Sequence, residues 1–139
     1  MPKIKIIISS LLVLLLVLAI GGWYAFNKPH RSLSDSTFIK ISADSLLASY
    51  QKDESVANSV YLDKPLFING EIAEINTNQA GEKVIILKTS DPISGVVCTL
   101  REKLVKIPKI GQQISIKGFC SGFISDIVLR DCQLETVKE

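Results

Sequence analysis

Histidine and closely spaced cysteines are scarce in this chain of 139 residues. His30 is its single histidine, and the three cysteines, Cys98, Cys120 and Cys132, form no C-x-x-C pair. A structural zinc site uses ligands in close pairs, a thioredoxin-like centre uses C-x-x-C, and a cysteine nucleophile needs a histidine base. The sequence therefore argues against metal and redox sites. We expect no catalytic residues and no cofactor, and thus no enzyme.

Charge is missing from one long stretch near the start of the chain. Residues 6–26, IIISSLLVLLLVLAIGGWYAF, contain 21 residues and no charged side chain. A helix of that length spans about 31 Å, close to the hydrocarbon thickness of a bilayer. The stretch also lacks the polar stripe at helical period that a soluble core helix would show. We predict a cytoplasmic N-terminus over residues 1–5 and a transmembrane helix over residues 6–26.

The same apolar run admits a second interpretation, a cleaved signal peptide. Residues 19–21, Ala-Ile-Gly, could imitate a small-x-small cleavage site. The run continues through Trp23, Tyr24 and Phe26, and aromatic residues suit the interfacial belt of a span that stays in place. We favour an uncleaved anchor that contacts the lipid bilayer, and secretion after cleavage is the alternative.

The positive charges on either side of the run barely distinguish the two possible orientations of the predicted helix across the membrane. Lys3 and Lys5 precede it, whereas Lys28 and Arg31 follow it. A first apolar segment with a short basic N-terminus usually translocates the rest of its chain, so we predict a single-pass protein of the bacterial inner membrane with its C-terminal domain in the periplasm. Residues 32–139 carry twelve Lys or Arg and fourteen Asp or Glu, a net charge of −2, so this part has no general attraction for phosphate backbones.

A polar linker and one domain are predicted after the apolar run. Residues 27–40 open with NKPHRSLSDST, which is typical of a linker. Residues 41–139 form the domain, which opens with an amphipathic helix. Ser42 can cap this helix and Asp44 suits the positive end of its dipole. The apolar pattern predicts two to five turns with a break near residues 52–53.

From Lys64 onward the apolar period becomes two, which indicates strands. Five strands are predicted, in PLFINGEIAEI (65–75), KVIILKT (83–89), GVVCTL (95–100), QQISIKGFCSG (112–122) and DIVLRDCQLE (126–135). The segment REKLVKIPKIG, residues 101–111, predicts a short helical connector ended by Pro108 and Gly111. Five short strands with a helical insert after the third are typical of an OB-fold, so we predict a mostly β, five-stranded Greek-key barrel.

Two segments of this barrel resemble a known family. ANSVYLDKPLFINGEI (57–72) and KGFCSGFISDIVLRDC (117–132) resemble the tRNA-anticodon-like OB-fold family of bacterial envelope proteins. The resemblance extends over roughly residues 43–135. It implies an OB-fold, and because the family is largely uncharacterised it implies no catalytic residues and no ligand.

Two of the cysteines flank a predicted hairpin. That hairpin would bring Cys120 and Cys132 opposite each other, about 4.5–5.5 Å apart at their Cβ atoms, which is near disulfide range. The alternation breaks after Leu129, which indicates a bulge that turns Cys132 inward. In an oxidising compartment we expect a Cys120–Cys132 disulfide, with Cys98 in the core. The alternative is three buried thiols that pack as small apolar side chains.

The two strands that stack bases in nucleic-acid-binding OB-folds contain no aromatic residue here (residues 83–89 and 95–100). One basic cluster lies in the predicted connector and could contact anionic headgroups or an acidic partner. Its members are Arg101, Lys103, Lys106 and Lys109. We predict a membrane-anchored, non-catalytic OB-fold binding or assembly module of the cell envelope, whose ligand is an envelope protein, a glycan or a small molecule. A nucleic-acid-binding OB-fold protein is the alternative, with nucleic acid the less favoured partner.

Overall fold

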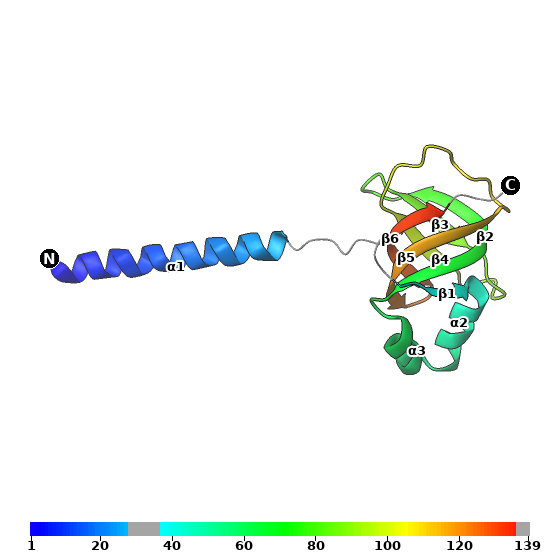
Figure 1. Ribbon diagram of the computed structural model, residues 1–139, viewed down its shortest axis with the longest axis horizontal. Coiled ribbons are helices and arrows are strands. Elements are labelled where there is room, and N and C mark those ends of the chain that lie inside the picture. Colours follow the sequence, from blue (N-terminus) through cyan, green and yellow to red (C-terminus); the bar gives the residue numbers. More distant parts are fainter. Residues whose placement is uncertain (28–36, 136–139) are drawn as a thin grey trace. The chain divides into compact units, whose positions relative to one another are not determined.

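The computed structural model describes residues 1–27 and 37–135, which fall into two compact units that divide after Ser32 (Figure 1). The first unit contains helix α1 (Pro2–Phe26). Within the described ranges, Lys3–Phe26 is the one helix long and apolar enough to cross a membrane, and a signal sequence would meet the same criterion. The predicted helix is therefore confirmed as one that is long and apolar enough to span a bilayer. Most of the predicted linker, with His30, lies outside the described residues.

The second unit is a closed mixed β-barrel, which confirms the predicted OB-fold. Its strands are β1 (Ile39–Ser42), β2 (Pro65–Thr77), β3 (Lys83–Leu87), β4 (Val96–Leu100), β5 (Gln113–Phe123) and β6 (Ile127–Glu135). The strand order is β1-β2-β3-β4-β6-β5, and pairing of β2 with β5 closes the barrel. Strands β4 and β6 run parallel, as do β1 and β2, and the other pairs are antiparallel.

Strand β1 was not expected from the sequence. It lies parallel to the first half of β2, with Ile39 opposite Leu66 and Ser42 opposite Asn69. Its first two residues belong to the segment predicted as linker. A four-residue strand gives little periodic signal, and its pairing depends on a partner far along the chain.

Two helices, α2 (Ala43–Lys52) and α3 (Glu54–Tyr61), lie together at one end of the barrel (Figure 1). The Ser42 side chain accepts a hydrogen bond from the Ser45 N–H, which confirms it as the N-cap of α2. Asp53 ends α2, and its carboxylate accepts from the Val56 N–H to begin α3. The predicted helix break at residues 52–53 is therefore confirmed.

The barrel interior follows the predicted alternation. Leu66, Ile68 and Ile72 of β2 are at most 1% exposed, as the period of two requires. The helices add Leu46, Leu47 and Tyr50 to the same core. Burying one large aliphatic side chain contributes about 1.5–3 kcal/mol. The core thus depends on residues from both the helices and the strands of the second unit rather than on a single hairpin.

The predicted helical connector is wrong, because residues 101–111 form an irregular loop without helix or strand. Pro108 lacks a backbone donor and disfavours helical geometry at the residue before it, and the few residues that remain are too short a segment to form a stable helix without packing. The loop is fixed at both ends, where the Arg101 N–H donates to Cys132 O and the Gly111 N–H donates to Ile72 O. We call residues 101–111 the basic loop; it lies at the opposite end of the barrel from α2 and α3 (Figure 1).

Candidate functional site

A cleft lies where the basic loop meets the turn between β2 and β3. One wall is formed by Ala80–Lys83 and the other by Leu100–Leu104 with Ile107. Its volume of about 430 Å³ falls within the range of small-ligand pockets, about 300–1,000 Å³. In OB-folds this turn and the second and third barrel strands form the region that binds oligonucleotides and oligosaccharides. The cleft is therefore the first candidate site.

The charge of the cleft is positive on balance. Lys83, Arg101 and Lys103 line it together with Glu82 and Glu102. The Glu82 carboxylate already accepts one hydrogen bond within its own turn, from the side-chain amide of Asn78 at 2.8 Å. Within residues 37–135 no cation of the basic loop takes part in an ion pair. An anionic ligand would thus meet cations whose charge is not already neutralised by a bound carboxylate.

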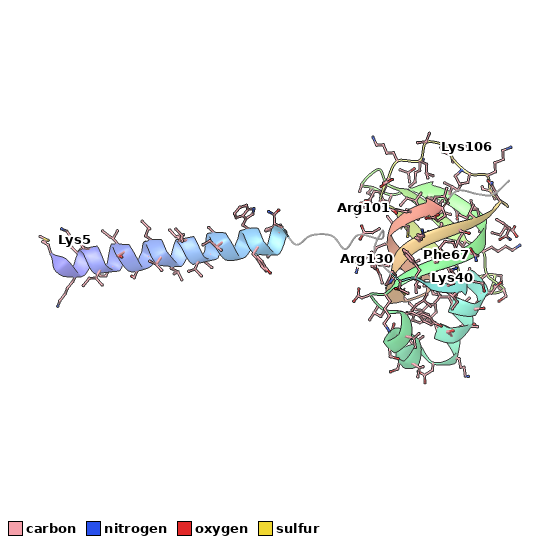
Figure 2. The ribbon with its side chains drawn as sticks, viewed as in Figure 1. Lys5, Lys40, Phe67, Arg101, Lys106 and Arg130 are labelled. Atoms are coloured by element: carbon pink, nitrogen blue, oxygen red, sulfur yellow. The ribbon has the colours of Figure 1, made fainter. Side chains whose placement is uncertain are left out.

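The structure divides the cationic cluster predicted from the sequence. Arg101 and Lys103 line the cleft, whereas Lys106 and Lys109 are exposed on the basic loop outside it. Figure 2 shows Lys106 and Arg101 well apart. Lys83 was missed, because it begins β3 and joins the cluster only through folding. Its place directly after a turn was the available signal.

A second surface combines aromatic rings with cations on the outer face of β1, β2 and β5. The ammonium of Lys117 lies 5.0 Å from the ring centroid of Phe38 and 5.9 Å from that of Phe67, and it also forms an ion pair with Glu135. Lys40 pairs with Phe67 across the β1–β2 register (Figure 2). We call Phe38, Phe67 and Lys117 the aromatic strip. It was not predicted from the sequence because its three members come from separate segments.

The strands expected to stack bases carry aliphatic side chains on their outer face. Val84, Ile86 and Val97 are half-buried there, beside Thr99. Base stacking needs a planar ring, and none of these residues provides one. The aromatic residues of the barrel are thus displaced from the usual stacking position.

The cysteines are arranged differently from the prediction. Cys98, Cys120 and Cys132 are buried and free, and no pair of them lies at disulfide distance in the described structure. The β5–β6 hairpin closes with Phe123 opposite Ile127, and its register, which shifts by one residue between Cys120 and Gly122, places Cys120 opposite Leu129 rather than opposite Cys132. The predicted bulge is confirmed, since Asp131 has φ 53° and Cys132 is fully buried. The expected Cys120–Cys132 disulfide is therefore not observed.

Two buried groups, the Cys132 thiol and the Tyr50 hydroxyl, have shifted pKa values. A hydrogen bond with the Cys98 thiol, followed by burial, raises the pKa of Cys132 well above its ordinary value. Burial, followed by the hydrogen bond with Cys120 at 3.3 Å, raises the pKa of Tyr50. Both groups stay protonated at neutral pH. They consequently act in packing rather than as nucleophiles.

Polar side chains elsewhere hold the barrel together. The Asp126 carboxylate accepts from the Gly95 N–H at 2.7 Å, which joins the β3–β4 loop to the β5–β6 turn. The Asp44 carboxylate accepts from the Ser90 N–H at 2.5 Å. Across the two described ranges, no three His, Cys, Asp or Glu side chains gather as a set of metal ligands. These carboxylates are thus engaged in structural contacts.

The sequence matches a known family over nearly its whole length. The model of the tRNA_anti-like family matches residues 1–133. The chain belongs to the tRNA_anti-like family. No curated protein matches it in sequence. Family membership and the closed barrel agree on the OB-fold that the sequence predicts.

Solved structures that resemble this chain include two from different organisms. The first is a crystal structure of a candidate nucleic acid-binding lipoprotein from Klebsiella pneumoniae, with a TM-score of 0.55 and 14% identity over 70% of this chain and 92% of that one. The second is a candidate aspartyl-tRNA synthetase from Leishmania major, with a TM-score of 0.44 and 12% identity over 84% of this chain and 25% of that one. At these identities the first likeness concerns the fold alone.

Proposed function

We propose that this protein is a membrane-anchored, non-catalytic binding module of the cell envelope. The observation that carries the proposal is the cleft between the β2–β3 turn and the basic loop, where Lys83, Arg101 and Lys103 converge. One of its walls, the β2–β3 turn, is among the loops with which OB-folds bind ligands. The ligand carries negative charge, as an acidic protein surface, an anionic glycan or a small anion would.

Placement in the envelope is supported by α1 and by a relative. Helix α1 is long and apolar enough to cross a bilayer. The Klebsiella relative with the same fold is described as a lipoprotein, which is an envelope-attached protein. We propose that α1 stays attached in the bacterial inner membrane and that the barrel lies in the periplasm.

The mature N-terminus tests the anchor. Intact mass and membrane fractionation of the cellular protein should give a chain that retains residues 1–27 and resists extraction by high salt. Detergent should release it, because the contact is with lipid acyl chains. Recovery of a soluble chain that begins near Gly22 or Trp23 would instead establish a cleaved signal peptide.

Site-specific photo-crosslinking in intact cells tests the cleft. A photoreactive residue at position 103 should yield a discrete adduct, and one at position 52, exposed on α2 at the other end of the barrel, should not. Arg101→Gln combined with Lys83→Gln should weaken the adduct, because the cleft then loses two cations. Equal labelling from positions 103 and 52, or no adduct from either, would remove the cleft from consideration.

Nucleic-acid binding is a second candidate, favoured by the aromatic strip and by the description of the Klebsiella relative. Three features argue against it. Lys117 already contacts both rings of the strip, β3 and β4 carry no ring, and residues 32–139 have a net charge of −2. Each stacked base contributes about 1–3 kcal/mol, so missing rings remove much of the affinity.

Fluorescence anisotropy with labelled single-stranded DNA and RNA decides between the two functions. We expect weak binding at low salt that disappears at physiological salt, because a few phosphate contacts are strongly salt-dependent. Micromolar or tighter binding that survives physiological salt and is lost in Phe67→Ala would establish the nucleic-acid function instead.

A further inference from the structure

The basic loop exposes an unusual number of aliphatic side chains. Val105, Ile107 and Ile110 are exposed to 106%, 57% and 67% of their reference areas. In contrast, Leu104 turns inward and packs against the core. The loop thus has an inner residue that attaches it to the barrel and an outer row of aliphatic residues that stays largely exposed in the described structure.

Cations alternate with this aliphatic row. Arg101, Lys103, Lys106 and Lys109 occupy the same eleven residues, against the single anion Glu102. The loop is held in place at its two ends by backbone hydrogen bonds to β6 and β2. A projecting segment that offers both aliphatic side chains and uncompensated cations matches a membrane surface. Aliphatic groups enter the boundary between headgroups and acyl chains, and cations contact lipid phosphates.

The chain itself brings such a surface within reach. Residues 27–38 connect α1 to β1, and twelve residues extend to at most about 40 Å. A domain of about 100 residues has a radius of gyration near 13 Å, so a tether of this length allows any side of the barrel to meet the bilayer. An acidic protein would satisfy the cations but would leave the exposed aliphatic side chains without an apolar environment.

We propose that the basic loop docks on the surface of the anionic bilayer that holds α1, with Val105, Ile107 and Ile110 in the interface and Lys103, Lys106 and Lys109 on lipid phosphates. This docking rests on the proposed function, in which α1 stays as an anchor. It places the cleft at the level of the headgroups. Ligands that approach along the membrane would then meet Lys83 and Arg101 first.

Tryptophan fluorescence of the full chain in nanodiscs tests the docking. In a Trp23→Phe background, Ile107→Trp gives the chain a single reporter on the loop. Its emission should shift to the blue, and brominated acyl chains should quench it, in discs of phosphatidylcholine with phosphatidylglycerol. Both effects should be lost in discs of phosphatidylcholine alone and in high salt, because surface electrostatics are screened.

Two matched controls accompany this reporter. Ile124→Trp places the ring on the β5–β6 turn, where Ile124 is 90% exposed, close to α3 and away from the loop, and it should show neither effect. Lys103→Gln, Lys106→Gln and Lys109→Gln together should abolish the effects at position 107, since each cation near an anionic surface is worth about fivefold in binding. Neutralising Lys52, Lys64 and Lys88 in the same way should leave them unchanged.

The outcomes separate docking from anchoring. If the emission of the reporter at position 107 is the same in anionic and neutral discs, or if the reporter at position 124 responds as strongly, docking is refuted while α1 remains an anchor. If cells contain only a chain that has lost α1, anchoring is refuted, and sedimentation of that soluble form with the same anionic vesicles decides docking. A crosslink from position 107 to a protein without lipid quenching would identify a protein partner and refute docking.

Discussion

Gly118 of β5 and Cys132 of β6 meet inside the barrel so closely that position 118 has no room for a side chain. A Cβ atom at position 118 would lie 2.6 Å from the sulfur of Cys132, and 3.4 Å from the carbonyl oxygen of Arg130. Cys132 reaches this place because Asp131 adopts a left-handed φ of 53° and the bulge turns the following residue inward. The glycine at position 118 and the bulge at Asp131 therefore depend on each other, because the bulge places Cys132 in the space that a side chain at position 118 would occupy.

We expect Gly118→Ala to lower the free energy of unfolding by about 1–3 kcal/mol, the usual cost of an overpacked core. In Cys132→Ala the sulfur is gone, so adding Gly118→Ala to that variant should cost much less. Urea denaturation of the four proteins gives the coupling energy. Gly70→Ala is the control: its Cβ would lie 3.2 Å from the flexible Leu87 Cδ1, so a smaller loss is expected. Additive losses at 118 and 132 would contradict the contact.

The three cysteines should be reduced, and their thiols should be protected from alkylation in the folded barrel. Because Cys98, Cys120 and Cys132 are free and fully buried, alkylation should modify none of them in the folded barrel and all three in denaturant. Mass spectrometry of the protein purified from cells without reducing agent provides the measurement. A linked pair of peptides containing residues 120 and 132 would show that the native register differs from the one described.

Stability should fall at alkaline pH because Cys132 has a raised pKa. Above about pH 8.5 the unfolded chain loses this thiol proton while the folded chain keeps it, so the unfolded state gains stability relative to the folded state. Below that pH the thiol is protonated in both states, so its full contribution to the free energy of unfolding is retained. Above it, the free energy of unfolding decreases by up to about 1.4 kcal/mol per pH unit until the folded pKa is reached. The raised pKa of Tyr50 adds a similar decrease above about pH 10.

Urea midpoints at pH 8 and pH 10 measure this slope. Cys132→Ala should be less stable at both pH values but should lose less between them, because it removes one titrating group. If the variant and the original protein show the same slope, Cys132 does not titrate as described.

Asp53 joins two helices, and substituting its side chain should weaken the cap at the start of α3 while its backbone contact with α2 stays. Its carboxylate caps α3 through the Val56 N–H, and its own N–H donates to Ser49 O at the end of α2. Asp53→Ala should cost about 0.5–2 kcal/mol of stability, whereas Asp53→Asn should retain most of the cap. Thermal denaturation of both variants provides the test. A loss in Asp53→Asn equal to that in Asp53→Ala would indicate charge rather than capping.

Local periodicity predicted much of the fold. The alternation of Leu66, Ile68 and Ile72 identified the inner face of β2, and the break after Leu129 identified the bulge at Asp131. These features follow from neighbouring residues, which the sequence displays directly. Pairing between distant segments was harder to predict from the sequence. The register that separates Cys120 from Cys132 depends on the turn that pairs Phe123 with Ile127 and on an irregularity between Cys120 and Gly122, and alternation alone reveals neither.

The candidate site was predicted in part for the same reason. Arg101 and Lys103 are close together in sequence and were found together, whereas Lys83 joins them only when β3 lies beside β4. Lys117 lies between Phe38 and Phe67 because β1, β2 and β5 are neighbours in space. A charge or ring pattern within one segment is visible in the sequence, but one shared by three segments requires the topology.

Strand β6 lies between β4 and β5, although it is the last strand in the chain. While the chain is being synthesised, β4 and β5 therefore each present an open edge until residues 127–135 emerge. Unpaired edges of this kind pair readily with other chains, so the nascent domain is most exposed to aggregation just before it is complete. A premature stop before Ile127 would leave both edges permanently open, and such a fragment should be a substrate for proteases and chaperones rather than a shorter working barrel.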